Sequence, residues 1–436
     1  MLSAKSKTTY DITNMNAPLH VEIVQKRKSH ESKDFIKGIV HSYLARFSCI
    51  SPGTTLSDKD LEENVELNEH VQSITFCDID HDSEVQMTNT EFLYHIYKLD
   101  CFGVETDTMT DNASGEELAA ADVWSLPSEE FHGLWESLVY DSKLKEDTLR
   151  FAETAFEFAD RGVNPTIVGC NRVVLLHGPP GTGKTSLCRA LAQKLAIRLG
   201  ERFPRARLLE INAHGLFSKW FSESGKLVAR LFERVRDIVE DRRLLACVLV
   251  DEVESLAHAR RAALAGLEPS DSIRAVNAIL TQLDRLRRHP NALVLATSNV
   301  TGAIDVAFVD RADVKRLVGP PTARAAYEIL RGCCGELAAR GVVWPRAGER
   351  LFALRVLEGS RFAESEAARA SLRLWALAGE AGAARLSARA LRRLPLLARA
   401  LHCEPRPDLL RFVDALHAAL RQHLADTRDL HSDDER

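Results

Sequence analysis

Residues 172–186 read RVVLLHGPPGTGKTS, an apolar run of strand type that ends abruptly in a loop rich in Gly and Pro. Leucines then recur at helical spacing, at Leu187, Leu191 and Leu195. The loop matches the phosphate-binding pattern G-x-x-x-x-G-K-S/T, in the strand–loop–helix context that this pattern requires. The alternative is an accidental Gly-rich turn, which would need this context to arise by coincidence.

The residue types of the loop explain its chemistry. Glycines let backbone N–H groups turn toward phosphate oxygens, and the N-terminus of the following helix favours the same anion. A lysine places a positive charge near the β- and γ-phosphates, and the hydroxyl after it can bind Mg²⁺. The predicted ATP-binding residues are Gly178, Pro179, Pro180, Gly181, Thr182, Gly183, Lys184 and Thr185, with Thr185 also a Mg²⁺ ligand. The loop predicts binding of a nucleoside triphosphate and leaves hydrolysis open.

Length and composition restrict the class of protein. A chain of 436 residues is longer than one hydrophobic core normally organises, so we expect two or three domains. A formal net charge of −5 gives no electrostatic reason to propose a nucleic-acid partner. We find no signal peptide and no apolar run as long as a membrane span. The 9 cysteines are scattered and are expected to be reduced thiols of an intracellular protein, in cytosol or nucleus.

Periodicity divides the chain into segments. Residues 1–104 mix strand and helix patterns and predict a small α+β domain. Residues 105–123 carry Thr, Asp, Gly and Ser with few apolar residues, which is typical of a linker. Residues 124–320 alternate strands with helices, and this order predicts an α/β domain with a parallel sheet. Residues 321–436 are rich in Ala, Leu and Arg at helical spacing and predict an all-helical domain.

An acidic pair supplies the second half of the nucleotide site. The apolar strand 247–250 runs directly into Asp251 and Glu252. A carboxylate at a strand end beside the loop can hold Mg²⁺, and the next one can polarise water against the γ-phosphate. We therefore predict Asp251 as the metal residue and Glu252 as the catalytic base. Two ordinary surface carboxylates are the alternative, although these seldom follow four buried-type residues.

Two further residues are candidates for the catalytic site. Asn299 ends the strand at 293–297 and could hold the attacking water, or it could be a turn-forming Asn at a strand end. Arg311 follows twelve residues later among acidic neighbours, where a surface ion pair is the usual interpretation. Its distance along the chain from Asn299 nevertheless suits an arginine finger that reaches the γ-phosphate of a neighbouring subunit.

The order of these features resembles the AAA+ ATPases: P-loop, acidic pair, polar strand end, arginine, then helical lid. The resemblance implies an α/β P-loop module with a helical lid, and a site shared between subunits of a ring, usually a homohexamer. It also implies that Arg389, within the lid segment LSARALRR, acts as a second sensor that contacts phosphate in the same chain. Hydrolysis would then depend on assembly.

A basic–aromatic triplet lies between the second strand and its next helix, at Lys219, Trp220 and Phe221. In AAA+ remodelling machines such a triplet lines the central pore and grips an extended polypeptide. Large rigid rings suit this task because they pack against a backbone of any sequence. Aromatic core packing at the start of a helix is the alternative.

A narrower resemblance is carried by the segments 131–135, 138–141, 176–198, 216–227, 251–256, 268–274 and 305–313. Together these segments resemble the pachytene-checkpoint family, also called thyroid receptor-interacting proteins. This resemblance implies remodelling of HORMA-domain proteins from closed to open, with a HORMA-like adaptor, in spindle-checkpoint silencing and meiotic chromosome-axis control. The 1–104 domain would then recognise substrate and adaptor, and the location would be nucleus and cytoplasm, with chromosomes and kinetochores.

Other functions remain as alternatives. An ATP-gated scaffold would assemble partners without unfolding them, so catalytic substitutions that leave assembly intact would separate it from a remodeller. A generic AAA+ unfoldase would have the same ATPase module and would act on a different substrate. A nucleic-acid motor is disfavoured by the excess of acidic over basic residues and by the aromatic triplet. DNA should stimulate ATP hydrolysis by such a motor, so a hydrolysis rate that DNA leaves unchanged would exclude it.

Overall fold

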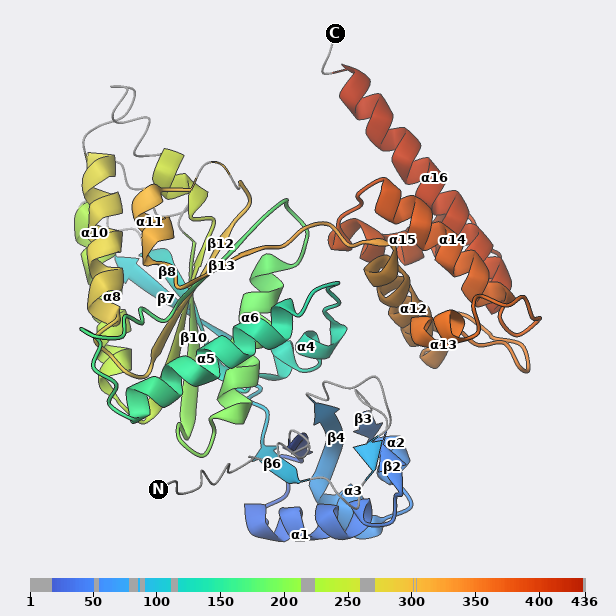
Figure 1. Ribbon diagram of the computed structural model, residues 1–436, viewed down its shortest axis with the longest axis horizontal. Helices are drawn as coiled ribbons and strands as arrows, with labels where there is room; N and C mark the ends of the chain where they lie inside the picture. Colours follow the sequence, from blue (N-terminus) through green and yellow to red (C-terminus); the bar gives the residue numbers. More distant parts are fainter. Residues whose placement is uncertain are drawn as a thin grey trace, which may run out of the picture. The chain divides into compact units, whose positions relative to one another are not determined.

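The computed structural model describes residues 18–50, 55–77, 85–86, 91–110, 117–212, 224–258, 271–300, 302 and 304–433 (Figure 1). The chain divides into two compact units between Asp100 and Cys101, with Ile197–Gly200 grouped with the first. Among the described helices, none combines the length and apolar character needed to cross a lipid bilayer.

The first unit is built on a four-stranded sheet of order β3-β4-β1-β6. Its central strand β1 runs antiparallel to β4 and parallel to β6. Helix α1 begins after Ser32, whose side chain accepts a hydrogen bond from the Phe35 N–H, and buries Ile36, Val40 and Leu44. The elements are β1 (Leu19–Gln25), α1 (Lys33–Leu44), β2 (Cys49–Ile50), β3 (Thr55–Ser57), α2 (Asp58–Leu61), α3 (Val65–His70), β4 (Val71–Cys77), β5 (Val85–Gln86) and β6 (Phe92–Tyr97). These elements confirm the α+β prediction for this part of the chain.

The second unit contains a seven-stranded sheet of order β13-β9-β12-β11-β10-β8-β7. The five strands from β13 to β10 are parallel, so their carboxyl ends share one edge, where α/β proteins bind ligands. The strands are β7 (Val104–Thr110), β8 (Glu117–Leu126), β9 (Val173–His177), β10 (Arg205–Asn212), β11 (Leu244–Asp251), β12 (Ala292–Ser298) and β13 (Val314–Leu317). The predicted parallel sheet is confirmed.

Helices cover both faces of this sheet, as Figure 1 shows. Helices α8 (Ser224–Glu240), α10 (Asp271–Leu286) and α11 (Val306–Arg311) pack on one face and share one hydrophobic core with the strands. Helices α5 (Leu144–Asp160) and α6 (Lys184–Arg198) lie on the other face. Strands buried on both faces read as continuous apolar runs, which is why β11 and β12 are visible in the sequence.

The predicted linker at 105–123 is wrong. Residues of β7 and β8 form an antiparallel hairpin, and β8 pairs antiparallel with β10, so the hairpin extends the sheet. Ala121 and Val123 are buried in the core of the sheet. A hairpin at a sheet edge is held largely by its backbone hydrogen bonds and keeps one face polar, so its composition resembles that of a linker.

The helical region forms the last part of the second unit. Its core contains Tyr327, Leu374, Leu394 and Phe412, each at most 1% exposed. The helices are α12 (Ala323–Ala339), α13 (Leu354–Gly359), α14 (Arg369–Ala383), α15 (Ala388–Leu401) and α16 (Leu409–Asp433). This confirms the all-helical prediction for this part of the chain.

Candidate nucleotide-binding site

The phosphate-binding loop joins β9 to α6 and is held tightly against its surroundings. Gly178 has φ +142°, and a Cβ there would lie 2.3 Å from the backbone oxygen of Val318. Gly183 has φ +94°, and a Cβ there would lie 2.9 Å from the Tyr140 hydroxyl, which donates to the Gly183 carbonyl at 3.1 Å. Gly178 therefore requires glycine, because a side chain there would be strained and would collide with the backbone. At Gly183 a side chain would be strained and would displace the Tyr140 hydroxyl.

Lys184 lies inside this loop. Its Nζ donates to the carbonyl oxygens of Gly178 and Pro179, each at 2.8 Å, and the side chain is buried. Burial lowers the pKa of Lys184, while the carboxylates of Glu254 and Asp251 oppose this shift. A desolvated cation held by neutral carbonyls interacts more strongly with an incoming anion than a hydrated one does.

The structure brings Thr185 and Asp251 together at the carboxyl edge of the sheet. The Thr185 hydroxyl donates to the two carboxylate oxygens of Asp251 at 3.1 and 3.3 Å. Thr297, at the end of β12, also donates its hydroxyl to Asp251. Hydroxyl and carboxylate oxygens are hard ligands of the type that Mg²⁺ prefers, so this donor set fits the ion.

Glu252 has an unusual backbone. Its φ is +59°, a left-handed conformation that costs a non-glycine residue about 1–3 kcal/mol. The turn is fastened to the end of β12, since the Val253 N–H donates to the Thr297 carbonyl at 3.0 Å. The Ser255 hydroxyl also donates to the Glu252 carbonyl at 2.6 Å. The backbone thus leaves the strand direction immediately after Asp251, at the residue predicted as the base.

Asn299 is connected to the acidic segment through Glu254, a residue that the sequence analysis missed. The Asn299 N–H donates to Glu254 Oε1 at 3.1 Å. Glu254 Oε2 is buried and has no hydrogen-bond partner among the described residues. Of the carboxylates that oppose the lowered pKa of Lys184, that of Glu254 acts most strongly. No local sequence pattern marks Glu254, because its role depends on the contact with Asn299.

Arg311 ends α11 and contacts its own chain. Its Nε and Nη2 donate to the two oxygens of Asp284 at 2.9 and 2.8 Å, and this interaction raises the pKa of Arg311. Its Nη1 donates to the Ala307 carbonyl at 2.7 Å. Within the described residues these contacts lie away from the phosphate-binding loop. They suit a residue that acts on a neighbouring subunit, and they equally suit a surface ion pair.

The helical region reaches the loop through the start of α15. The Arg389 N–H donates to the Gly181 carbonyl at 3.0 Å, and the Arg389 charge contributes to the lowered pKa of Lys184. Ser387 caps the helix, its hydroxyl oxygen accepting from the Ala390 N–H at 3.2 Å. The structure thus places Arg389 beside the loop of its own chain. The predicted pore residues Lys219, Trp220 and Phe221 lie outside the described residues.

A P-loop within five parallel strands, an acidic strand end beside it and a helical lid against it together define an AAA+ ATPase, an enzyme that binds and hydrolyses ATP. Family profiles agree, matching "ATPase family associated with various cellular activities (AAA)" at residues 174–320. The "TRIP13 N-terminal domain" matches at 14–101 and the "TRIP13-like, AAA+ ATPase lid C-terminal domain" at 322–424.

Whole-chain relatives narrow this class. A pachytene checkpoint protein 2 homolog from Danio rerio is 44% identical over 392 residues, covering 90% of each chain. The homolog from Homo sapiens is 43% identical over 417 residues, covering 94% of each. The solved structure of C. elegans PCH-2 superposes with a TM-score of 0.76 at 33% identity, covering 94% of this chain and 99% of that one. The chain belongs to the family of pachytene checkpoint protein 2 homologs.

Proposed function

We propose that this ATPase assembles as a homohexamer and converts closed HORMA-domain proteins to the open form, which releases their partners. A HORMA-like adaptor presents the substrate. The conversion acts in spindle-checkpoint silencing and in control of the meiotic chromosome axis. The observation that carries the proposal is the extent of the family match. The match covers 90% or more of the chain and includes the N-terminal domain as well as the ATPase domain.

In this proposal the described residues divide the chemistry between them. Lys184 binds the β- and γ-phosphates, and Glu252 accepts the proton of the attacking water. Asn299 orients that water. Thr185 and Asp251 would hold Mg²⁺, which when bound neutralises charge on the phosphate oxygens. The 3.1 Å contact between Thr185 and Asp251 supports this assignment, since both ligands already lie together.

Force generation and regulation complete the scheme. Arg311 reaches the γ-phosphate of the neighbouring subunit, which makes hydrolysis a property of the ring. Arg389 couples the lid to the nucleotide, and its backbone bond to Gly181 supports this role. Lys219, Trp220 and Phe221 grip the substrate in the pore. The place of action is nucleus and cytoplasm, including chromosomes and kinetochores.

The decisive experiment mixes the purified full-length chain and ATP with a closed HORMA protein and its adaptor, and follows the open conformer over time. Conversion should require hydrolysable ATP and should be lost in Glu252→Gln. A ring that binds the complex without converting it would favour the ATP-gated scaffold. Conversion of unrelated folded proteins at the same rate would favour a generic unfoldase.

Trp220→Ala is expected to reduce conversion of the HORMA substrate at least about tenfold, because one rigid aromatic anchor commonly carries about 2 kcal/mol or more of a contact, roughly thirtyfold in affinity. The measurement is the initial rate of open-conformer formation at saturating ATP. Trp220→Phe keeps a ring and should retain most of the rate. Conversion by Trp220→Ala at the wild-type rate would remove the pore triplet from the mechanism.

Glu254 is a positioning residue in this scheme, because it fixes the backbone of Asn299. Glu254→Ala should lower kcat about 10- to 100-fold, the effect of losing a hydrogen bond to a charged group. Glu254→Gln keeps an acceptor and should fall between this variant and the wild type. The KM for ATP should change little in both. If both Glu254 variants instead lost thermal stability along with kcat, and Glu254→Gln were no more active than Glu254→Ala, the role of Glu254 would be purely structural.

A further inference from the structure

A short segment of the second unit contacts both the phosphate-binding loop and the helical lid formed by α12 to α16. We name this segment, residues 137–141, the lid clasp. Its first residue, Ser137, ends helix α4 (Leu134–Ser137), and the clasp leads toward α5. The clasp lies outside the phosphate-binding sequence pattern, which begins at Gly178. Its contacts therefore join two parts of the nucleotide site that the pattern does not connect.

The clasp is fastened to the lid at both of its ends. At the first end, Arg392 Nη2 from α15 donates to the Ser137 carbonyl at 2.5 Å. At the other end, Asp141 accepts the Thr322 N–H at 3.0 Å and the Thr322 hydroxyl, directly before α12, where a carboxylate also favours the helix dipole. Between them, Val139 packs against the hydrophobic core of the lid. A displacement of the lid would therefore move the clasp.

Tyr140 connects the clasp to the phosphate-binding loop. Its hydroxyl donates to the Gly183 carbonyl at 3.1 Å, and the Leu187 N–H donates to the same carbonyl at 2.8 Å as a helical bond of α6. A carbonyl oxygen has two lone pairs, so one donor holds it from within the helix and the other from outside. Burial raises the pKa of Tyr140, and its hydroxyl therefore keeps its proton and stays a donor at neutral pH.

The hydrogen bond to Gly183 bears on the next N–H of the loop. The Gly183 carbonyl and the Lys184 N–H belong to one trans peptide unit, so they point in opposite directions. Gly183 has φ +94° and no side chain to restrict it, and the donors to its carbonyl therefore help to fix the plane of this peptide. The first N–H groups of a helix have no partner within the helix and are the donors that bind phosphate.

We propose that Tyr140 is a positioning residue for phosphate binding, and that the lid clasp makes its position depend on the lid. When the lid shifts, the bonds at Ser137 and Asp141 move the clasp, and Tyr140 then turns the Lys184 N–H toward or away from the β-phosphate. The bond between Arg389 and Gly181 is a separate link between lid and loop. This inference rests on the ATPase activity and is independent of the HORMA substrate and of the hexamer.

The first test measures binding of ADP with Mg²⁺ to the full-length chain by titration calorimetry, because ADP carries the β-phosphate and is not turned over. Tyr140→Phe removes the hydroxyl and keeps the ring. This variant should bind ADP about two- to tenfold more weakly, the range for loss of one hydrogen bond. Binding as tight as that of the parent would overturn the positioning role.

A double-mutant cycle tests the connection to the lid. Asp141→Ala removes both bonds from Thr322 and should weaken ADP binding at least about threefold, since the clasp is then fastened at one end only. In a chain that already carries Tyr140→Phe, the same change should weaken binding less than about 1.5-fold, because the link to the loop is already broken. Losses that multiply, or an Asp141→Ala chain that binds ADP like the parent, would overturn the coupling.

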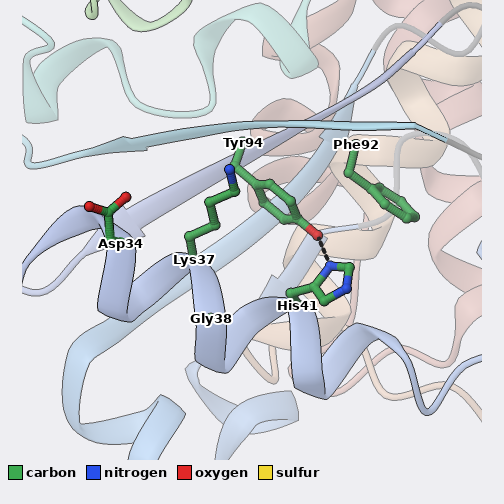
Figure 2. Close-up of a pocket in the computed structure, with 6 residues that line it drawn as sticks. All are labelled: Asp34, Lys37, Gly38, His41, Phe92 and Tyr94. Carbon is green, nitrogen blue, oxygen red and sulfur yellow. Dashed lines mark hydrogen bonds between the residues drawn. The ribbon is translucent and has the colours of Figure 1, made fainter.

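Two other tyrosines provide matched controls, because each can lose a hydroxyl hydrogen bond away from the loop. Tyr327 in the lid donates to the Phe352 carbonyl at 2.7 Å. Tyr94 in the first unit has its hydroxyl 2.9 Å from His41 Nδ1, as Figure 2 shows. Tyr327→Phe and Tyr94→Phe should bind ADP like the parent, with thermal unfolding as a check of the fold. If Tyr327→Phe weakened binding as much as Tyr140→Phe, the loss would reflect lid stability, and the positioning role would be overturned.

Discussion

Glu252→Gln should yield an enzyme that binds ATP with nearly wild-type affinity and hydrolyses it about 10²–10⁴-fold more slowly, the usual contribution of a general base. The amide cannot accept the proton of water, while the phosphate contacts of Lys184 and the loop are unchanged. The measurement is single-turnover hydrolysis together with equilibrium binding of a fluorescent ATP analogue. The left-handed backbone at Glu252 does not depend on the side-chain charge, so the fold should be retained.

Asp251→Asn provides the comparison. Asp251 contacts Thr185, so this change should weaken binding in the presence of Mg²⁺ and have little effect in its absence. The two variants therefore separate loss of the base from loss of the metal site. Wild-type turnover by Glu252→Gln would assign proton transfer to another residue, and Glu254 would be the first candidate to test.

Arg311→Ala should lower kcat of the assembled enzyme about 10³–10⁵-fold, the range for removal of an arginine finger. An arginine finger stabilises charge that develops on the transferred phosphoryl group, so if Arg311 plays this part ATP binding should change much less than turnover. The Arg311→Lys variant keeps the charge without the planar fork and should recover only part of the rate. The measurement is steady-state hydrolysis, with the oligomeric state determined for each variant.

Asp284→Asn is the matched control for Arg311, because it removes the charge of its partner in the same chain. If Arg311 works on a neighbouring subunit, Asp284→Asn should retain most of the activity. Mixtures of Arg311→Ala with Glu252→Gln should then recover some hydrolysis, because a wild-type base and a wild-type arginine can meet at some interfaces. Equal losses for Arg311→Ala and Asp284→Asn would support the surface ion pair instead.

Strands buried on both faces were predictable, whereas those at the edges of the sheet were not. Strands β9, β11 and β12 are apolar along almost their whole length, so their type is visible without knowledge of the fold. Strand β13 has the sequence VKRL and is mostly exposed, so it lacks the apolar run that marks its neighbours. The hairpin of β7 and β8 was predicted as a linker because its stability comes from pairing with β10, a partner far away in the sequence.

The candidate site shows the same division. The loop residues and the pair Asp251 and Glu252 follow from local patterns. Glu254 and Thr297 had no such pattern, since their positions matter only through contacts with Asn299 and Asp251. The contact between Arg389 and Gly181 was expected only by resemblance, and it joins residues that lie far apart in the chain.

The sequence by itself determined the nucleotide chemistry, because a glycine-rich loop after an apolar strand restricts the local backbone to a conformation that binds phosphate. The tertiary structure decided which distant groups meet that loop. The order of strands brought Asp251 to Thr185, the lid brought Arg389 to Gly181, and the packing of α11 against α10 gave Arg311 its acidic partner. Local periodicity encodes each element, but only the pairing of elements selects the neighbours of a side chain.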